Sequence, residues 1–307
     1  MRILVVGVGA VGGFVGGRLV QAGRDVTFLV RPRRAAQLAE RGLRIDDGTR
    51  TEEIEARAVT KDDLGGTYDL VLLGVKAEAL PAAIEDFRPA VGPETAVVPF
   101  INGIKHIKLL TNAFGPAALG GVLKIVTQLE PNGDIRQFVP GGSIEVGELD
   151  SGGSGRVAAI VEALTIPSFT VSVPADIMDA MWAKWVFIAT IGAITSIARG
   201  PIGEVTAVPG GTAFAVATLD EAASIARAAG HELGERDYEQ TKALVTAKGT
   251  STTSSLSRDL VSGRPTEVEA VLGDLVEIAH ATGQSVPRLE AATLTLRTHN
   301  ARIAHTA

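Results

Sequence analysis

The stretch MRILVVGVGAVGG, residues 1–13, decides how the first half of the chain folds. Its apolar run at residues 3–6 predicts a buried strand. The loop that follows has the pattern G-x-G-x-x-G and consists of Gly7, Gly9, Ala10, Val11 and Gly12. In such a loop the first glycine allows a tight turn, the second lets a pyrophosphate approach the backbone, and the third lets the next helix pack on the strand. A glycine-rich turn without a ligand is the alternative, but the position between a strand and a helical pattern favours a dinucleotide-binding site.

Apolar runs recur through the first half and are separated by helical patterns. The clearest strand candidates are residues 3–6, 26–30, 70–73 and 97–100, and helices are expected after Gly12 and over residues 81–87. Apolar strands that alternate with helices indicate parallel strands covered on both faces. The sequence therefore predicts an α/β fold that begins with a Rossmann-type dinucleotide-binding domain.

The pattern changes after Pro174. Helical periodicity runs through residues 176–199, 211–229, 235–247 and 267–281, and again from Arg288. We therefore place a domain boundary near Val173. Residues 1–173 are expected to form the dinucleotide-binding domain, and residues 174–307 are expected to form an all-helical C-terminal domain that holds substrate and catalytic groups.

Composition excludes several classes of function. The 307 residues carry a net charge of −6, which disfavours a nucleic-acid partner because phosphate binding needs a basic face. Cysteine is absent, so disulfides, thiolate zinc sites and cysteine nucleophiles are excluded, and the five scattered histidines suggest no metal site. The apolar stretch 186–198 is shorter than the about 20 residues that span a bilayer, and the first residues do not resemble a signal peptide. We expect a cytoplasmic protein without a membrane partner.

Basic residues at the end of the second strand indicate which dinucleotide binds. Arg31 follows VTFLV directly, and Arg33 and Arg34 come close behind. An NAD enzyme usually carries an acidic residue here, which holds the ribose 2′-hydroxyl. Arginines instead match a 2′-phosphate, because a guanidinium binds phosphate in a forked geometry. The residues favour NADP(H) as the cofactor, with a solvated basic helix start as the alternative.

Three further polar residues stand where ligands could bind. Lys76 follows the third strand in LLGVKA, Asn102 follows the fourth strand in FINGI, and Lys184 lies in the helical pattern MWAKW. The carboxyl ends of parallel strands are where such sheets bind ligands. Each residue also has a simpler interpretation: a solvated lysine, an Asn-Gly turn, and a lysine that snorkels from an apolar helix.

Together, these features resemble the ketopantoate reductase family, the 2-dehydropantoate 2-reductases. That family has the glycine loop, an arginine after the second strand, a lysine after the third and Asn-Gly after the fourth. Its helical domain opens with a W-x-K helix and later carries a serine, an aspartate and a T-E pair. The matching residues here are Trp182, Lys184, Ser255, Asp259, Thr266 and Glu267. The resemblance spans nearly the whole chain and implies NADPH-dependent reduction of a 2-keto acid to a 2-hydroxy acid, with a link to pantothenate biosynthesis.

The resemblance also implies a role for each site residue. Lys184 would be the general acid that protonates the ketone oxygen. Glu267 would hold a substrate hydroxyl, and Ser255 the substrate carboxylate. Asn102 would position nicotinamide and substrate, and Lys76 would line the cofactor side. Lys184, Glu267 and Asn102 are therefore the expected catalytic set.

The chain departs from the family at three substrate positions. Family members usually carry asparagine where this chain has Ile188, Gly192 and Ile202. Losing these amides removes hydrogen bonds that discriminate a hydroxylated keto acid, so the sequence does not identify ketopantoate as the substrate. Arg199 and Thr195 could supply replacement substrate contacts. A helix C-cap and a core hydroxyl are the alternatives for these two residues.

Two other functions remain compatible with the sequence. An apolar pocket would suit reduction of a bulkier, more apolar ketone or of an imine. A non-catalytic NADP(H)-binding sensor belongs to a different class, and retention of Lys184 and Glu267 counts against it because a sensor needs neither. The expected partner is a small keto acid or related carbonyl compound, and a homodimer is compatible with the sequence.

Overall fold

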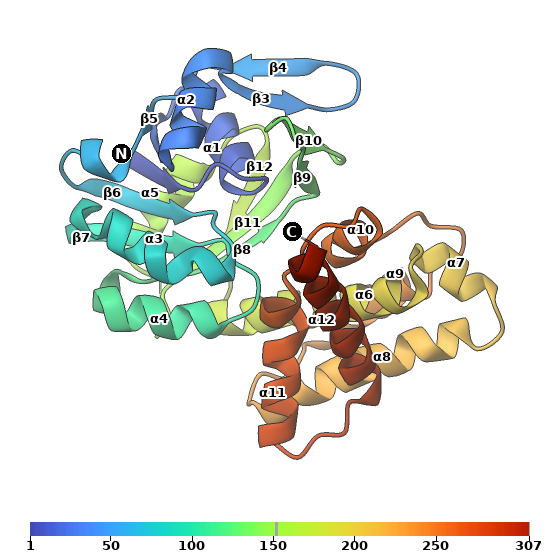
Figure 1. The fold of residues 1–307 in the computed structure, drawn as a ribbon. Helices are drawn as coiled ribbons and strands as arrows, with labels where there is room; N and C mark the ends of the chain where they lie inside the picture. Colours follow the sequence, from blue (N-terminus) through green and yellow to red (C-terminus); the bar gives the residue numbers. More distant parts are fainter. Residues whose placement is uncertain (151–152, 307) are drawn as a thin grey trace. The chain divides into compact units, whose positions relative to one another are not determined.

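The computed structural model describes residues 1–150 and 153–306, which divide into two compact units (Figure 1). The first, here the α/β unit, contains Met1–Ile101 and His106–Ala180. The second, here the helical unit, contains Asn102–Lys105 and the chain from Met181 onward.

A five-stranded parallel sheet forms the centre of the α/β unit. Its strands, in spatial order, are β5 (Ala58–Val59), β2 (Asp25–Leu29), β1 (Arg2–Val6), β6 (Tyr68–Leu73) and β7 (Val91–Pro99). Side chains of β1 alternate between two cores. Ile3 and Val5 pack in the core that includes residues of α1 (Gly12–Gln21). Leu4 and Val6 pack in the core that includes residues of α3 (Leu80–Phe87). Burial on both faces confirms the parallel α/β arrangement.

Two smaller sheets and three more helices complete this unit. One sheet has the order β4 (Thr51–Ile54), β3 (Leu43–Asp46), β10 (Ile135–Gln137), β9 (Thr127–Leu129), and the other β12 (Phe169–Ser172), β11 (Gly142–Gly147), β8 (Gly120–Lys124). The helices are α2 (Pro32–Arg41), α4 (Lys105–Phe114) and α5 (Gly155–Leu164). The β3–β4 hairpin was not predicted, because six of the twelve residues in its sequence LRIDDGTRTEEI are charged. Ion pairs such as Arg136–Asp46 hold it to the neighbouring strand.

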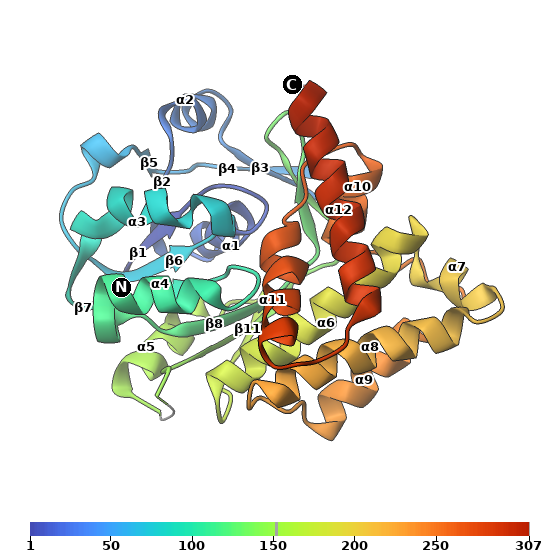
Figure 2. The ribbon, with the colours of Figure 1, turned by 60° about the horizontal axis from the view of Figure 1, so that its bottom comes forward.

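The described part of the helical unit contains helices and no strand, which confirms the predicted all-helical C-terminal domain. Its elements are α6 (Ile177–Ala198), α7 (Ile202–Ala207), α8 (Gly211–Ala228), α9 (Glu235–Val245), α10 (Ser255–Val261), the π-helical segment η5 (Glu269–Gly273), α11 (Asp274–Ala281) and α12 (Pro287–Thr306). Figure 2 shows α12 lying alongside α8. α6 begins in the α/β unit and continues into this one.

Helix α6 is the one described helix that is long and apolar enough to cross a membrane. However, 67% of its apolar window is buried inside the structure. Trp185, Val186, Ala189 and Ala193 from this helix lie in the main core of the helical unit. This burial is that of a core helix, as residues 186–198 were expected to be.

Candidate dinucleotide and catalytic sites

Three predicted cofactor residues follow neighbouring strands of the parallel sheet. Gly7 comes directly after β1, Arg31 follows β2 and Lys76 follows β6. Strands β2, β1 and β6 are adjacent and parallel. Their carboxyl ends therefore lie at one edge of the sheet, where ligands of open α/β sheets bind. The structure thus brings these three positions to the same edge.

Close backbone contacts fix the shape of the glycine loop. Gly7 has φ +88°, a left-handed conformation that favours glycine. A Cβ atom on Gly12 would lie 2.0 Å from the Gly7 carbonyl oxygen, and one on Gly74 would lie 2.5 Å from the Gly12 nitrogen. Only residues without a Cβ allow this approach, so Gly7, Gly12 and Gly74 set how α1 starts against the ends of β1 and β6.

Gly9 differs from its neighbours, because no contact within the chain requires a glycine there. A Cβ on Gly9 would meet no heavy atom within 4 Å, and its φ is not in the left-handed region. The open space lies in the loop that precedes the N-terminus of α1, where free backbone amides and the helix dipole favour an anion. The residues present therefore fit a pyrophosphate that approaches the backbone at Gly9.

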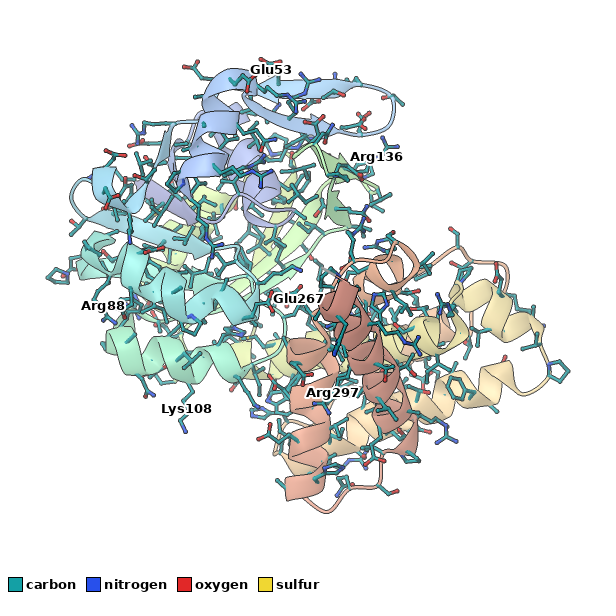
Figure 3. The ribbon with its side chains drawn as sticks, viewed as in Figure 1. Glu53, Arg88, Lys108, Arg136, Glu267 and Arg297 are labelled. Atoms are coloured by element: carbon teal, nitrogen blue, oxygen red, sulfur yellow. The ribbon has the colours of Figure 1, made fainter. Side chains whose placement is uncertain are left out.

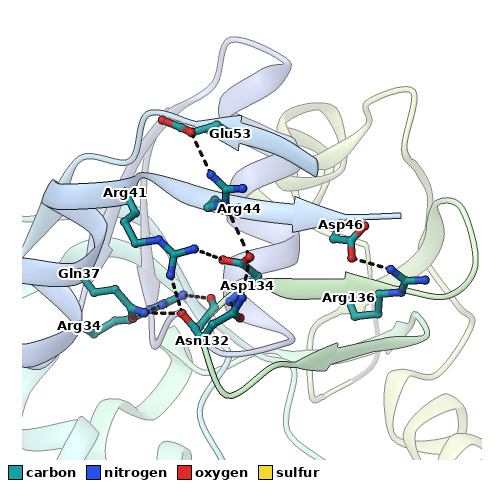
Figure 4. A network of polar contacts seen from close by, with 10 residues as sticks. Arg34, Gln37, Arg41, Arg44, Asp46, Glu53, Asn132, Asp134 and Arg136 are labelled. Atoms are coloured by element: carbon teal, nitrogen blue, oxygen red, sulfur yellow. Dashed lines mark hydrogen bonds and ion pairs between the residues drawn. The ribbon is translucent and has the colours of Figure 1, made fainter. Parts of the chain in front are cut away.

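The three arginines after β2 do not share one environment. Arg31 is the N-cap residue of α2 and is exposed, as is Arg33. Arg34 instead donates a hydrogen bond to the Gly133 carbonyl oxygen at 3.0 Å and another to Gln37 (Figure 4). Burial lowers the pKa of the Arg34 guanidinium. Arg34 is held by the turn between β9 and β10. Of the three arginines expected to face a 2′-phosphate, Arg31 and Arg33 are the two that are exposed.

Lys184 is half-buried on α6, next to a firmly anchored tryptophan. The indole nitrogen of Trp185 donates a hydrogen bond to the Val271 carbonyl oxygen of η5 at 2.9 Å. The rings of Trp182 and Trp185 also pack together, with their centroids 5.1 Å apart. These contacts fix the stretch of α6 that carries Lys184.

Asn102 belongs by its contacts to the helical unit, although it follows a strand of the sheet. Gly103 has φ +79°, and a Cβ on it would lie 2.5 Å from the Ala270 carbonyl oxygen. The Lys105 amine pairs with Asp274 at 2.8 Å and with Glu277 at 2.6 Å, and both carboxylates raise the pKa of Lys105. The Asn-Gly turn is therefore held against η5 and α11, a placement that the sequence did not suggest.

Ser255 and Glu267 lie at the starts of two helices in the same unit. Ser255 is the first residue of α10 and is exposed, whereas Glu267 is half-buried just before η5. The helix cap itself is Ser254, whose hydroxyl accepts a hydrogen bond from the Ser257 amide at 3.0 Å and contacts the Thr195 hydroxyl at 2.8 Å. Thr195 is fully buried, in agreement with the core-hydroxyl alternative.

The positions that depart from the family pattern have unequal exposure. Ile202 is fully buried in a small core with Ile194 and Val205, so it does not form an open pocket wall. Gly192 is also buried, and a Cβ on it would lie 3.0 Å from Leu256 Cδ1. Of the three positions, Ile188 alone is half-buried. Ile188 is therefore the position among the three that can present an apolar side chain to the expected substrate pocket.

Arg199 ends helix α6 with a left-handed backbone. Its φ of 54° is the single positive value among the described residues other than glycine. This conformation is the one expected just past a helix C-terminus. The geometry agrees with the helix-end alternative, and a substrate contact by Arg199 stays a prediction. Among the described residues, no group of three His, Asp or Glu residues is arranged to hold a metal ion.

Comparison with known proteins identifies relatives over nearly the whole chain. Residues 3–151 match the family model described as ketopantoate reductase PanE/ApbA, and residues 176–300 match its C-terminal counterpart. The uncharacterized oxidoreductase YkpB of Bacillus subtilis (strain 168) is 32% identical and covers 98% of this chain and 99% of its own. The 2-dehydropantoate 2-reductase of Archaeoglobus fulgidus is 29% identical, with 90% of each chain covered. The ternary structure of D-mandelate dehydrogenase with NADH and anilino(oxo)acetate aligns with a TM-score of 0.86 at 22% identity, and the alignment covers 99% of this chain and 100% of that one.

Gly9 and Gly12 provide a matched test of the dinucleotide loop. Gly9→Ala should fold with a change in the free energy of unfolding below about 0.5 kcal/mol, because open space surrounds its Cβ. Its dinucleotide dissociation constant should rise at least about tenfold, because the methyl group occupies the space where the ligand approaches and removes a charge-assisted hydrogen bond. Gly12→Ala should instead lose folded, soluble protein. Titration calorimetry with thermal unfolding measures both effects, and normal dinucleotide binding by Gly9→Ala would contradict the assignment.

Proposed function

The chain belongs to the ketopantoate reductase family, oxidoreductases that act on CH–OH and C=O groups, and on this premise we propose that it reduces a 2-keto acid to a 2-hydroxy acid with NADPH. The observation that carries the proposal is the open position at Gly9 in a loop otherwise closed by backbone contacts. We assign dinucleotide binding to residues 1–173 and the substrate and general acid to residues 174–307. The enzyme is proposed to be cytoplasmic, and a homodimer stays a prediction.

The proposed chemistry divides between cofactor and protein. NADPH, when bound, supplies a hydride to the carbonyl carbon. The Lys184 ammonium donates a hydrogen bond to the carbonyl oxygen and then transfers a proton to it, so that ketone, hydride and proton give the alcohol. Its charge also stabilises the developing alkoxide. The anchored Trp185 beside it limits how far this part of α6 can move.

The other proposed site residues bind and orient. Glu267 holds a substrate hydroxyl, and the exposed Ser255 binds the substrate carboxylate. Asn102 positions nicotinamide and substrate from a turn that is packed on η5. Lys76 lines the dinucleotide site at the end of β6.

The choice of NADPH over NADH rests on the exposed arginines after β2. Arg31 lies at the start of α2, next to the sheet edge where the dinucleotide is proposed to bind. Its guanidinium can form forked hydrogen bonds with a 2′-phosphate. Arg34 is not assigned this role, since its hydrogen bonds go to the turn between β9 and β10.

Replacement of Arg31 tests the cofactor proposal. Arg31→Ala should weaken NADPH binding more than about tenfold, the loss of one charge-assisted hydrogen bond of about 1.5–3 kcal/mol, and should barely change NADH binding. Arg34→Ala serves as the matched control, because loss of its turn contacts should not discriminate between the two cofactors. Equal losses of NADPH and NADH affinity in Arg31→Ala would refute the assignment.

Replacement of Lys184 tests the general acid. Lys184→Ala should lower kcat by about 10²–10⁴-fold while NADPH still binds. The exposed Lys108, labelled in Figure 3, offers a control in which Lys108→Ala leaves kcat unchanged. Stopped-flow measurement of NADPH oxidation gives the rate, and near-normal turnover in Lys184→Ala would remove Lys184 from the mechanism.

Two other functions stand as alternatives to the main proposal. Ile188 gives the substrate region an apolar, half-exposed side chain, which favours a bulkier ketone or an imine as a second candidate substrate. A non-catalytic NADP(H) sensor would bind the dinucleotide without turnover. NADPH consumption with a panel of keto acids, apolar ketones and imines separates the three.

Substrate preference gives a direct test of the apolar position. An apolar side chain cannot hydrogen-bond the 4-hydroxyl of ketopantoate, and burial of that hydroxyl without a partner costs about 1–3 kcal/mol. We expect ketopantoate to show a lower kcat/KM than a 2-keto acid with an apolar side chain of similar size. The two are compared side by side at saturating NADPH. A tenfold advantage for ketopantoate would mean that Glu267 and Ser255 suffice to recognise it.

A further inference from the structure

Side chains of helix α12 contact the segment that carries Glu267. Residues 264–267 are not helical, and the chain enters the π-helical segment η5 two residues after Glu267. His299 contacts the Arg264 carbonyl oxygen through its Nε2 atom at 2.9 Å. From the same turn of α12, Asn300 contacts Thr266, directly before Glu267, and Arg297 contacts Glu269, two residues after it. The short non-helical segment therefore takes its position from α12.

Asn300 holds both polar groups of the Thr266 backbone. The Thr266 amide donates to Asn300 Oδ1 at 2.9 Å, and Asn300 Nδ2 donates to the Thr266 carbonyl oxygen at 2.9 Å. The Thr266 hydroxyl donates to the same Oδ1 at 3.1 Å. Thr266 is only 7% exposed. Two of these hydrogen bonds hold the main chain of the residue that precedes Glu267, and the third holds its hydroxyl.

Arg297 contacts Glu269, on the C-terminal side of Glu267. Its Nε and Nη2 atoms donate to the two carboxylate oxygens of Glu269 at 2.8 and 2.6 Å. A Cβ on Gly273 would lie 2.2 Å from Glu269 Oε2, so the Glu269 carboxylate packs directly over the Gly273 backbone. Figure 3 labels Arg297 and Glu267 on this unit. The Arg297 and Glu269 side chains are 50% and 60% exposed, and an ion pair between such exposed groups contributes little by itself to stability. The more buried Asn300 contact is therefore the main constraint.

The same π-helical segment also contacts the helix of the proposed general acid. Val271 in η5 accepts the hydrogen bond from Trp185, the residue after Lys184. A π-helical turn leaves carbonyl groups without their usual α-helical partners, and such turns are frequent at functional sites. One short stretch, from Thr266 to Val271, therefore contains both backbone contacts: that of Asn300 next to Glu267 and that of Trp185 next to Lys184.

We propose that Asn300 is a positioning residue, which sets the place of the Glu267 carboxylate by holding the Thr266 backbone. Asn300 does not act on substrate itself. The inference rests on the proposed role of Glu267 in substrate binding. It adds a residue 33 positions further along the chain, on a different helix.

Kinetics with a double-mutant cycle test the proposal. Asn300→Ala should lower kcat/KM about 10–100-fold, because a misplacement of about 1 Å in a site can cost that much, while the NADPH dissociation constant stays unchanged. In a Glu267→Ala background, Asn300→Ala should cause no further loss, because its effect passes through that carboxylate. Losses that multiply would overturn the proposal. Thr298→Ala is the control on α12, since its hydroxyl donates a hydrogen bond to the Leu294 carbonyl oxygen of its own helix.

Crystal structures give a readout that does not need turnover. In Asn300→Ala the Glu267 carboxylate should shift by more than about 1 Å or lose order, with the rest of the helical unit unchanged. An unmoved Glu267 would overturn the inference, whatever the substrate is. If the wild-type protein reduces no 2-keto acid, the proposed function fails, and this comparison still decides the role of Asn300. If Asn300→Ala does not fold, Asn300→Asp keeps the acceptor for the Thr266 amide, loses the donor to its carbonyl group, and should show a smaller shift in the same direction.

Discussion

The approach of Gly12 to the Gly7 carbonyl oxygen is the contact on which the α/β unit depends. A Cβ on Gly12 would stand 2.0 Å from that oxygen, so no other residue type lets α1 start where it does. The start of α1 in turn places Phe14, Val15 and Leu19 in the core beneath the sheet. The same tight turn contains Gly9, where a Cβ would meet no heavy atom of the described residues within 4 Å. One steric constraint thus shapes both the core and the proposed ligand site.

The helical unit depends on a different kind of constraint. Here side chains form hydrogen bonds with the main chain, whereas in the α/β unit two backbone segments approach each other at glycines. Trp185 donates a hydrogen bond to the Val271 carbonyl oxygen, and Asn300 forms hydrogen bonds with both the amide and the carbonyl group of Thr266. A buried backbone group without a partner is costly, so Trp185 stabilises the π-helical segment η5 and Asn300 stabilises the non-helical residues that precede it. Lys184 and Glu267 are each next to a residue held in this way. Their proposed chemistry therefore relies on backbone positions that neighbouring helices fix.

The two kinds of constraint differ in how visible they are in a sequence. Gly7, Gly9 and Gly12 lie within six residues after a strand, so the local pattern predicts the loop, the sheet and the strand ends that carry Arg31 and Lys76. The β3–β4 hairpin was missed because its strands are only four residues long and carry few apolar residues among many charges. Arg34 was grouped with Arg31 because the two are three residues apart in sequence, and its contact with Gly133 distinguishes it from Arg31. Ile202 was named as a substrate position because family members carry asparagine there, and its complete burial assigns it to a core.

The sequence by itself determined the class of the fold, the family pattern and the identities of the proposed chemical groups, because these follow from local periodicity and from short motifs. Only the tertiary structure decided which residues, distant in sequence, hold the backbone next to those groups. Asn300 meets Thr266, and Asn102–Lys105 meets η5 and α11, across long separations in the chain. The physical reason is that a local pattern reports the conformation of its own backbone, whereas the hydrogen-bond partners of an irregular segment are chosen by the packing of helices that are distant in sequence.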